Sequence, residues 1–286
     1  MSRSQALRAP INVDDHLSTR NFSRIAAHIY ERVGIIISEN KRTMVESRLR
    51  RRLPIVGADD LDEYCDKVFS GELGDGEDEH LINAITTNKT DFFREPKHFD
   101  YMMGTILPDL VKQGSRKIKV WSAACSTGAE PYTIAMLLDE ALTGRGTPSF
   151  AITATDIDTK VLETARRGIY EAELVEPVSD RLRRKYVMVA KDAKRREIRM
   201  APKLRSAIAF GRMNLMDSRF AADRDHDMIF CRNVLIYFNK VTQEAVVRRL
   251  CDHIKPGGHL FLGHAESILG FDVPLTQVAN TVFRRN

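Results

Sequence analysis

Two acidic residues of this 286-residue chain follow predicted strands and could hold a small ligand. Glu130 directly precedes a predicted helix that starts at Pro131, after a strand and a tight turn around Gly128, in KIKVWSAACSTGAEPYTIAMLL. The turn lacks the Gly-x-Gly-x-x-Gly pattern, so it does not support a pyrophosphate on the helix N-terminus. Asp156 ends the next strand, where a carboxylate can accept hydrogen bonds from both ribose hydroxyls. An adenosine ligand without phosphates points to S-adenosylmethionine, although a plain Rossmann-like domain with a capping Asp stays open on these two features.

Further polar side chains follow two later strands. Arg232, Asn233 and Tyr237 come just past the fourth strand of the sheet, in FCRNVLIYF, and Asn214 and Leu215 follow another strand in MNLMD. Ligands of open α/β sheets bind at the carboxyl ends of strands. Singly, Asn214 is most often a turn residue and Tyr237 most often a core residue. Together, the polar groups at several strand ends predict one binding site.

The elements that would position these residues alternate after Asn88. Short β-rich runs separated by helices predict a parallel sheet with crossover connections. The runs are Ile118–Ala123, Ala151–Thr155, Ala207–Phe210, Asp227–Cys231, His259–Gly263 and Val282–Arg284, and the helices include Pro131–Leu142, Asp158–Arg167 and Gln243–Ile254. No clear helix precedes the last run, so that strand is a candidate for antiparallel pairing. Between residues 187 and 210, VMVA, REIRM and SAIAF predict a small antiparallel sheet.

Before Asn88 the apolar periodicity is helical. A first helix runs to Val33, with Asn21 or Ser23 as its cap. A second runs unbroken from about Asn40 to the Pro54–Gly57 region, and two shorter helices follow within residues 61–86. These segments predict a small helical bundle.

Composition and charge exclude several classes of protein. Apolar residues make up 43% and charged residues 29% of the chain, which is typical of a globular protein. The apolar runs are far shorter than the ~20 residues of a membrane span, and the first residues lack the apolar core of a secretory signal. Four cysteines and eight histidines show neither CxxC nor HExxH spacing. We therefore expect reduced thiols in a cytoplasm and no metal site.

The net charge of +5 is unevenly distributed. Residues 1–55 sum to +6, residues 56–85 to −9 and residues 181–212 to +10. Each basic block is either a solvated face or a surface for a polyanion, such as a nucleic acid or an acidic protein.

Five motifs give the chain a resemblance to a known family. TTNKTDFFRE, VWSAACSTGAEPYT, TDID, FCRNVLIYF and KPGGHLFLGHAES resemble, in order and length, those of the bacterial chemotaxis receptor methyltransferases, the CheR family. The resemblance implies an α/β fold, namely a Rossmann-like class I S-adenosylmethionine methyltransferase domain with a small antiparallel β-subdomain insert, after an all-helical N-terminal domain. It implies domains at 1–90 and 91–286, with the insert at about 176–210.

The resemblance also implies an activity and a place of action. The enzyme would methylate glutamate side chains in the cytoplasmic helical region of membrane chemoreceptors and release S-adenosyl-L-homocysteine. It would be a monomer of the bacterial cytoplasm, recruited to membrane receptor arrays, with no membrane insertion and no nucleic-acid partner.

Roles for individual residues follow from the same resemblance. Cofactor contacts fall on Asn88, Thr90, Arg94, Glu130, Asp156, Asn214, Leu215, Arg232 and Asn233. Arg94 and Tyr237 resemble the residues that act near the methyl group. Ala129 stands where the family usually has a glutamate, but the acid before the proline, Glu130, is kept, so we expect cofactor binding to survive.

A glutamate acceptor would simplify the chemistry. Its ordinary pKa of about 4.3 makes it a carboxylate nucleophile at neutral pH, so no general base is needed and catalysis is by positioning. Because receptor methylation helices are acidic, the basic helix with Arg48, Arg51 and Arg52 is a candidate substrate-binding surface.

Two other functions stay open. A nucleic-acid methyltransferase would use the basic blocks for phosphate contacts, although the chain has no Asn-Pro-Pro-Tyr type base pocket and only 7% aromatic residues. A non-catalytic binding module on the same fold is the other, and the retained Arg94, Glu130, Asp156 and Tyr237 argue against it.

Overall fold

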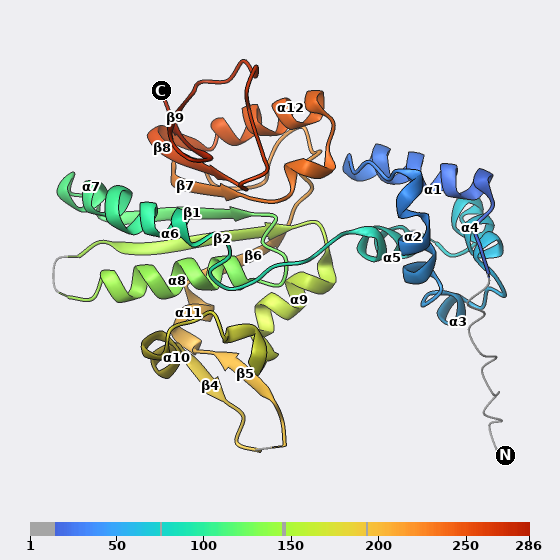
Figure 1. Ribbon diagram of the computed structural model, residues 1–286, viewed down its shortest axis with the longest axis horizontal. Helices are drawn as coiled ribbons and strands as arrows, with labels where there is room; N and C mark the ends of the chain where they lie inside the picture. The colour runs from blue at the N-terminus through green and yellow to red at the C-terminus, as the bar shows by residue number, and fades with distance from the viewer. Residues whose placement is uncertain (1–14, 75, 145–146, 193) are drawn as a thin grey trace. The chain divides into compact units, whose positions relative to one another are not determined.

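The computed structural model describes residues 15–74, 76–144, 147–192 and 194–286, which fall into two compact units (Figure 1). The first unit ends at Thr87 and the second is Asn88–Asn286. Among the described residues, no helix is both long and apolar enough to cross a membrane.

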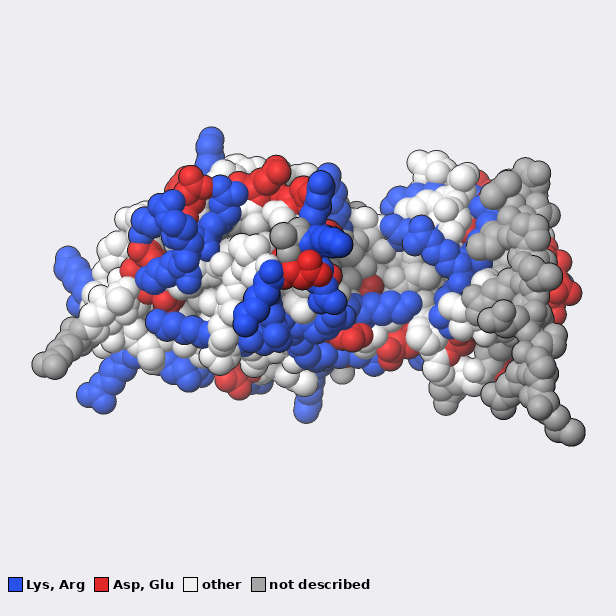
Figure 2. Space-filling view, turned by 90° about the horizontal axis from the view of Figure 1, so that it is seen from below, with Lys and Arg blue, Asp and Glu red and all other residues white. Residues whose placement is uncertain are grey.

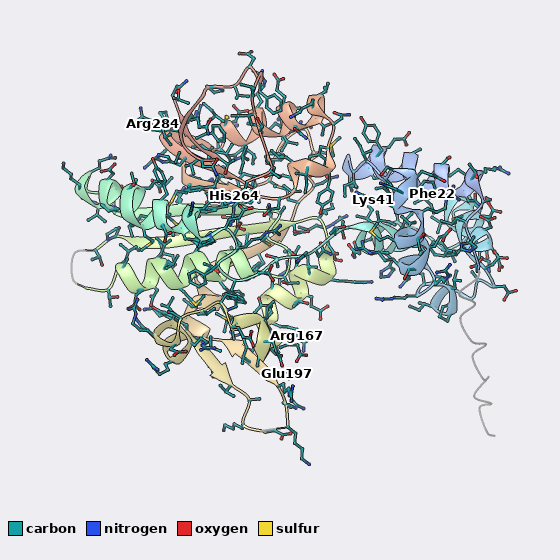
Figure 3. All side chains as sticks on the ribbon, viewed as in Figure 1. Phe22, Lys41, Arg167, Glu197, His264 and Arg284 are labelled. Atoms are coloured by element: carbon teal, nitrogen blue, oxygen red, sulfur yellow. The ribbon has the colours of Figure 1, made fainter. Side chains whose placement is uncertain are left out.

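The first unit is helical, as predicted. Its elements are α1 (Thr19–Val33), the 3-10 helix η1 (Glu39–Lys41), α2 (Arg42–Leu49), α3 (Leu53–Val56), α4 (Leu61–Ser70) and α5 (Gly76–Ile85). Apolar side chains spaced by three or four residues meet in its core, and Phe22 of α1 is one of them (Figure 3).

The start of α1 differs from the prediction. The cap is Ser18, whose Oγ accepts a hydrogen bond from the Asn21 N–H at 3.2 Å. Asn21 is buried inside the helix and its Nδ2 donates to Asp62 Oδ1 at 2.9 Å. The expected caps, Asn21 and Ser23, were wrong because a tertiary partner uses the polar side chain of Asn21.

The second helix is also broken, contrary to the prediction of one unbroken helix from about Asn40. α2 ends at Leu49 and α3 begins at Leu53. Pro54 has no N–H to donate to the carbonyl of Arg50, four residues earlier, so a continuous helix cannot pass this point.

The second unit is built on a seven-stranded sheet. Its strands are β1 (Lys117–Ala123), β2 (Ser149–Asp156), β6 (Ile208–Arg212), β7 (His226–Cys231), β8 (Ile254–Leu262), β9 (Leu275–Ala279) and β10 (Val282–Arg285), in the order β6-β2-β1-β7-β8-β10-β9. Its helices are α6 (Pro96–Tyr101), the π-helical η2 (Met102–Ile106), α7 (Leu107–Lys112), α8 (Ala129–Ala141), α9 (Thr159–Arg167), the 3-10 turn η4 (Leu235–Tyr237) and α12 (Lys240–Cys251).

The pairing of these strands sets where ligands can bind. From β6 to β8 all neighbours are parallel, so their carboxyl ends meet at one edge of the sheet. β10 is antiparallel to β8, which confirms the alternative left open for the last strand. β9, antiparallel to β10, was not predicted.

A separate small sheet carries the inserted segment. It has the order β3-β5-β4, with β3 at Ile169–Glu171, β4 at Val187–Val189 and β5 at Glu197–Met200, all antiparallel. The 3-10 turn η3 (Ala172–Val175) and the helices α10 (Asp180–Tyr186) and α11 (Pro202–Ser206) accompany it. The basic block of residues 181–212 falls largely here, and Lys and Arg side chains gather around this part of the surface (Figure 2).

One strand of that insert was assigned wrongly. These residues were predicted both as the run Ala207–Phe210 of the parallel sheet and, as SAIAF, in the small sheet. Ile208 of β6 pairs in parallel with Ile152 of β2, so the first assignment is confirmed and the second is wrong. The third small strand is β3, upstream of the segments used for the prediction. The α/β architecture with a small antiparallel sheet and a helical N-terminal unit is confirmed.

Candidate active site

The loop between β1 and α8 has a strained backbone. Ala124 and Ser126 have positive φ angles of 66° and 49°, and Gly128 has 94°. A Cβ atom on Gly128 would lie 2.9 Å from the Ala165 Cβ, so the turn requires glycine. Glu130 stands in the first turn of α8 directly after it. Backbone strain of this kind clusters at functional sites.

Asp156 ends β2 and is bonded to this loop. Its carboxylate accepts hydrogen bonds from the backbone N–H groups of Ser126 at 2.8 Å and Asp158 at 3.0 Å. Burial raises the pKa of this carboxyl to about 6 in spite of those two bonds. A perturbed acid at a strand end is typical of a functional site.

Asn88 joins the ends of β1 and β2. Its Nδ2 donates to Asp158 Oδ2 at 2.7 Å, and its carbonyl accepts from Ser126 Oγ at 2.8 Å. Asp158 in turn caps α9 by accepting the N–H groups of Lys160 and Val161. The segment that precedes α6 is thereby placed across the carboxyl ends of two strands.

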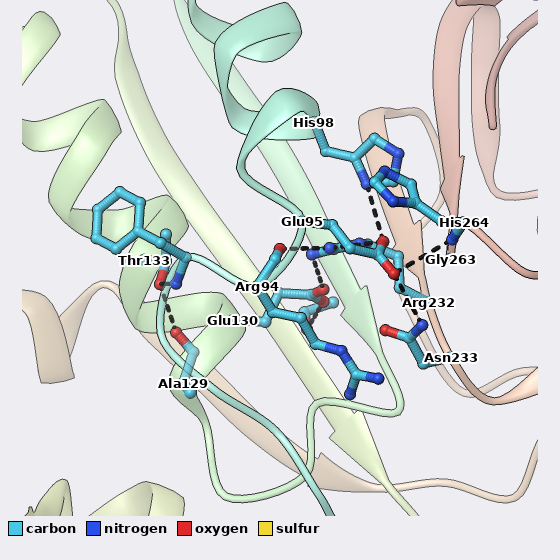
Figure 4. A network of polar contacts seen from close by, with 12 residues as sticks. Arg94, Glu95, His98, Ala129, Glu130, Thr133, Arg232, Asn233, Gly263 and His264 are labelled. Carbon is cyan, nitrogen blue, oxygen red and sulfur yellow. Dashed lines mark hydrogen bonds and ion pairs between the residues drawn. The ribbon is translucent and has the colours of Figure 1, made fainter. Parts of the chain in front are cut away.

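A buried arginine lies between two carboxylates, which come from segments far apart in the sequence (Figure 4). Arg232 donates from Nη1 to Glu130 Oε2 at 3.0 Å and from Nη2 to Glu95 Oε2 at 2.9 Å. Its side chain is only 2% exposed. Ser122 Oγ donates to the other oxygen of Glu130 at 2.7 Å. Glu95, Glu130 and Arg232, which we call the Arg232 cluster, sum to a charge of −1.

Glu95 is ionised throughout the physiological range. Burial alone would raise its pKa, but hydrogen bonds from Asn233 and Arg232 lower it to about 2. Glu95 therefore contributes its negative charge to the Arg232 cluster throughout this range.

Asn233 is held through both its backbone and its side chain. Its φ is 59°, its N–H donates to Glu266 Oε2 at 3.0 Å and its Nδ2 donates to Glu95 Oε1 at 3.0 Å. The same Glu266 accepts the N–H groups of Gly263 at 2.5 Å and Leu235 at 2.7 Å. Because Glu266 is buried, its pKa is raised above the ordinary value.

Three further residues were predicted for the site: Thr90, Arg94 and Tyr237. Arg94 precedes Glu95, donates to the carbonyl of Lys89 at 2.8 Å and directs its guanidinium away from the Glu95 carboxylate (Figure 4). Thr90 and Tyr237 are partly exposed, Thr90 in the segment before α6 and Tyr237 at the end of η4.

The loop after β6 carries the last two predicted cofactor residues. Asn214 Oδ1 accepts the Met216 N–H at 3.0 Å, and the carbonyl of Leu215 accepts from Arg249 at 2.8 Å. The N–H of Met213 donates to the carbonyl of Asp156 at 2.9 Å. This loop therefore adjoins the end of β2.

The three arginines proposed for substrate binding differ in exposure. Arg52 is buried and pairs with Glu77 through two hydrogen bonds, at 2.9 and 2.6 Å, and Tyr64 also donates to Glu77 at 2.9 Å. Arg48 donates to backbone carbonyls of residues 84–86. Only Arg51 of the three is exposed.

Sequence reasoning gave no role to Glu95, His98, His264 or Glu266. Glu95 lies in the motif FFRE, and His264 and Glu266 lie in GHAES. The presence of acids and a histidine within these motifs was the signal from which they could have been found. The spacing of the histidines predicted no metal site, yet ligand atoms of Glu95, His98 and His264 lie within 4.8 Å of one another, as a metal site would require. Both Glu95 oxygens accept hydrogen bonds, including one from the backbone N–H of His264 at 3.2 Å.

Family comparisons divide the chain in the same way as the fold. The family described as "CheR methyltransferase, all-alpha domain" matches residues 20–86, and the one described as "CheR methyltransferase, SAM binding domain" matches residues 88–283. The two matches together cover most of the chain.

Curated relatives are similar over both units. The chemotaxis protein methyltransferase of Escherichia coli (strain K12) is 39% identical over 93% of this chain and 91% of its own length. That of Salmonella typhimurium is 40% identical over 88% of this chain and 85% of its own. Chemotaxis protein methyltransferase 2 of Pseudomonas aeruginosa is 36% identical over 95% of each.

Proposed function

The chain belongs to the CheR methyltransferase family, and we propose that it transfers a methyl group from S-adenosylmethionine to glutamate side chains of membrane chemoreceptors. Membership confirms the resemblance found in the motifs and the presence of an S-adenosylmethionine-binding domain. The observation that carries the proposal is the Arg232 cluster, an anionic group at the carboxyl edge of the sheet.

The chain's own groups fit this cofactor. Glu130 belongs to a cluster with one guanidinium for two carboxylates, so its carboxylate suits an ammonium group. Asp156 would accept hydrogen bonds from the ribose hydroxyls. Arg94 would hold a carboxylate, either that of the cofactor or that of the acceptor. When bound, the cofactor supplies a methyl group on a sulfonium.

The residues then act by positioning. The acceptor glutamate is already a nucleophile, and its oxygen must align with the methyl carbon and the sulfur. Arg94 and Tyr237 are the proposed catalytic residues: the guanidinium guides the incoming carboxylate, and the Tyr237 hydroxyl orients the methyl group or its acceptor. The products are a glutamyl methyl ester and S-adenosylhomocysteine.

The receptor surface is proposed on the helical unit. Arg52 is neutralised by Glu77, and Arg48 is engaged by backbone carbonyls. Arg51 therefore supports the docking of an acidic receptor helix best among the three arginines. We further propose that the enzyme works in the bacterial cytoplasm, at the receptors' cytoplasmic helices.

The test is a transfer assay. The protein is incubated with methyl-labelled S-adenosylmethionine and receptor-containing membranes, and the label is followed into the receptor band. We expect labelling that disappears when the receptor's acceptor glutamates are replaced by alanine. Label on RNA or DNA, or no label on any protein, contradicts the proposal.

A further inference from the structure

We propose that Glu95 is a positioning residue of this methyl-transfer site, acting through Asn233 and Arg232. The inference rests on the proposed function for its catalytic readout. It assigns to Glu95 the task of fixing which atom of the Asn233 amide faces the ligand space.

Glu95 draws three chain segments together. It stands directly before α6, with a left-handed backbone (φ 55°), and its side chain is 13% exposed. Its Oε2 accepts from Arg232 after β7, and its Oε1 accepts from Asn233 and from the backbone N–H of His264 after β8. The carboxylate thus connects the ends of two neighbouring strands to the segment before α6 (Figure 4).

The amide orientation of Asn233 follows from this contact. An ionised carboxylate is only an acceptor, so the Asn233 group that faces Glu95 must be the NH₂ donor, Nδ2. The carbonyl oxygen Oδ1 is then turned away from Glu95. An acceptor oxygen is the atom that suits a cationic cofactor, whereas an outward NH₂ group would oppose it.

The backbone of Asn233 is fixed by Gly263 and Glu266. A Cβ on Gly263 would lie 2.5 Å from Asn233 Nδ2 and 2.8 Å from its backbone nitrogen. Glu266 accepts the Asn233 N–H and holds the left-handed conformation. Because the backbone of Asn233 is fixed, the hydrogen bond to Glu95 determines the orientation of its side-chain amide.

The test exchanges donor and acceptor. Glu95→Gln removes the charge at constant size, and Asn233→Asp places two carboxylates face to face. The double variant E95Q/N233D restores a donor opposite an acceptor between these two side chains and conserves the net charge, while the His264 N–H loses its acceptor. Asp139→Asn is the matched control, because Asp139 is also buried in this unit and pairs with Lys203 and Tyr186, outside the Arg232 cluster.

Two readouts are measured on the full chain: kcat with saturating receptor and cofactor, and the affinity for S-adenosylhomocysteine by calorimetry. We expect each single variant to lose at least tenfold in kcat and severalfold in affinity. The kcat of the double variant should be at least fivefold higher than that of N233D, and its affinity for S-adenosylhomocysteine should be close to that of the wild type. D139N should change neither, although its melting temperature falls.

The outcomes separate the two proposals. If the wild type methylates no receptor glutamate, the proposed function fails, and the calorimetric exchange still tests Glu95. If E95Q keeps kcat and affinity within twofold of the wild type, the positioning role is wrong. It is equally wrong if the losses of the single variants simply multiply in the double variant.

Discussion

Each unit of this enzyme buries an arginine against carboxylates, but the charges are balanced differently. In the helical unit Arg52 meets the single carboxylate of Glu77, which Tyr64 also supports. In the α/β unit Arg232 meets two carboxylates, Glu95 and Glu130. The first group is neutral and the second is anionic.

The difference teaches how to read a buried ion pair. A balanced pair has no charge left for a ligand, and breaking it costs stability. An unbalanced cluster at the carboxyl edge of a parallel sheet leaves a charge for a cationic ligand. The predictions below change one group at a time and ask whether stability or ligand affinity responds.

The largest effect is expected from Arg52→Met. It leaves Glu77 buried without a counter-charge and should destabilise the helical unit by about 3–5 kcal/mol. Cofactor affinity should not change. The only tryptophan, Trp121, is buried in β1, so its fluorescence reports the α/β unit while helical circular dichroism also reports the first. Arg51→Met, at an exposed position, is the control and should shift stability by no more than about 0.5 kcal/mol. Equal stability of the two variants contradicts the assignment.

Glu130→Gln tests the unbalanced Arg232 cluster of the α/β unit. It removes the charge proposed to meet the cofactor's ammonium and should weaken cofactor binding by about 1.5–3 kcal/mol, roughly 10- to 150-fold. Glu77→Gln, the corresponding change in the balanced pair, should lower stability and leave the affinity unchanged. Calorimetry of both variants decides, and an equal affinity for E130Q and the wild type excludes the role given to Glu130.

A pH series should show an effect of about tenfold. Asp156 has a pKa of about 6, raised by burial. Protonation removes acceptor capacity for the ribose, so cofactor affinity should fall by about tenfold from pH 7 to pH 5.

The contribution of Asp156 to the free energy of unfolding should change with pH in the opposite direction to the cofactor affinity. Its pKa is higher in the folded chain than in the unfolded one, so its contribution to folding is largest below about pH 4 and is lost as the pH rises through 6. Asp156→Asn cannot titrate, and its affinity profile should be flat. A wild-type affinity that is constant from pH 7 to pH 5 rules out the ribose role.

The smallest effect concerns two tyrosine hydroxyls. Tyr237→Phe should lower turnover by about three- to tenfold at unchanged cofactor affinity. Tyr64→Phe removes the bond to Glu77, so stability should fall by about 1 kcal/mol while turnover stays constant. Lower turnover for Tyr64→Phe and unchanged turnover for Tyr237→Phe would contradict the catalytic role given to Tyr237.

Sequence patterns predicted the helices and strands better than they predicted which charged side chains contact one another. Strands β1, β2, β7 and β8 and the strand-end positions of Asp156 and Arg232 follow from periodicity and turn residues. SAIAF was misassigned because a short apolar run carries no information about which sheet it joins.

The partners of charged groups depend on contacts that no local pattern encodes. Glu95 and Arg232 are 137 residues apart in the chain. Arg52 was assigned to a basic surface together with its neighbours in the chain. Its partner, Glu77, lies in the acidic block of residues 56–85, and nothing in the local sequence pairs the two. Only the tertiary structure distinguishes a paired arginine from an exposed one.

The stability of the transferred methyl group in alkali tests the central claim most directly. A glutamyl methyl ester is attacked by hydroxide at its carbonyl carbon, whereas methyl groups on nucleobase nitrogens or carbons have no such route. After transfer to receptor-containing membranes, mild alkali should release the label as volatile methanol, and nuclease treatment should release none. Label that survives alkali, or that leaves with nucleic acid, contradicts methylation of glutamate side chains.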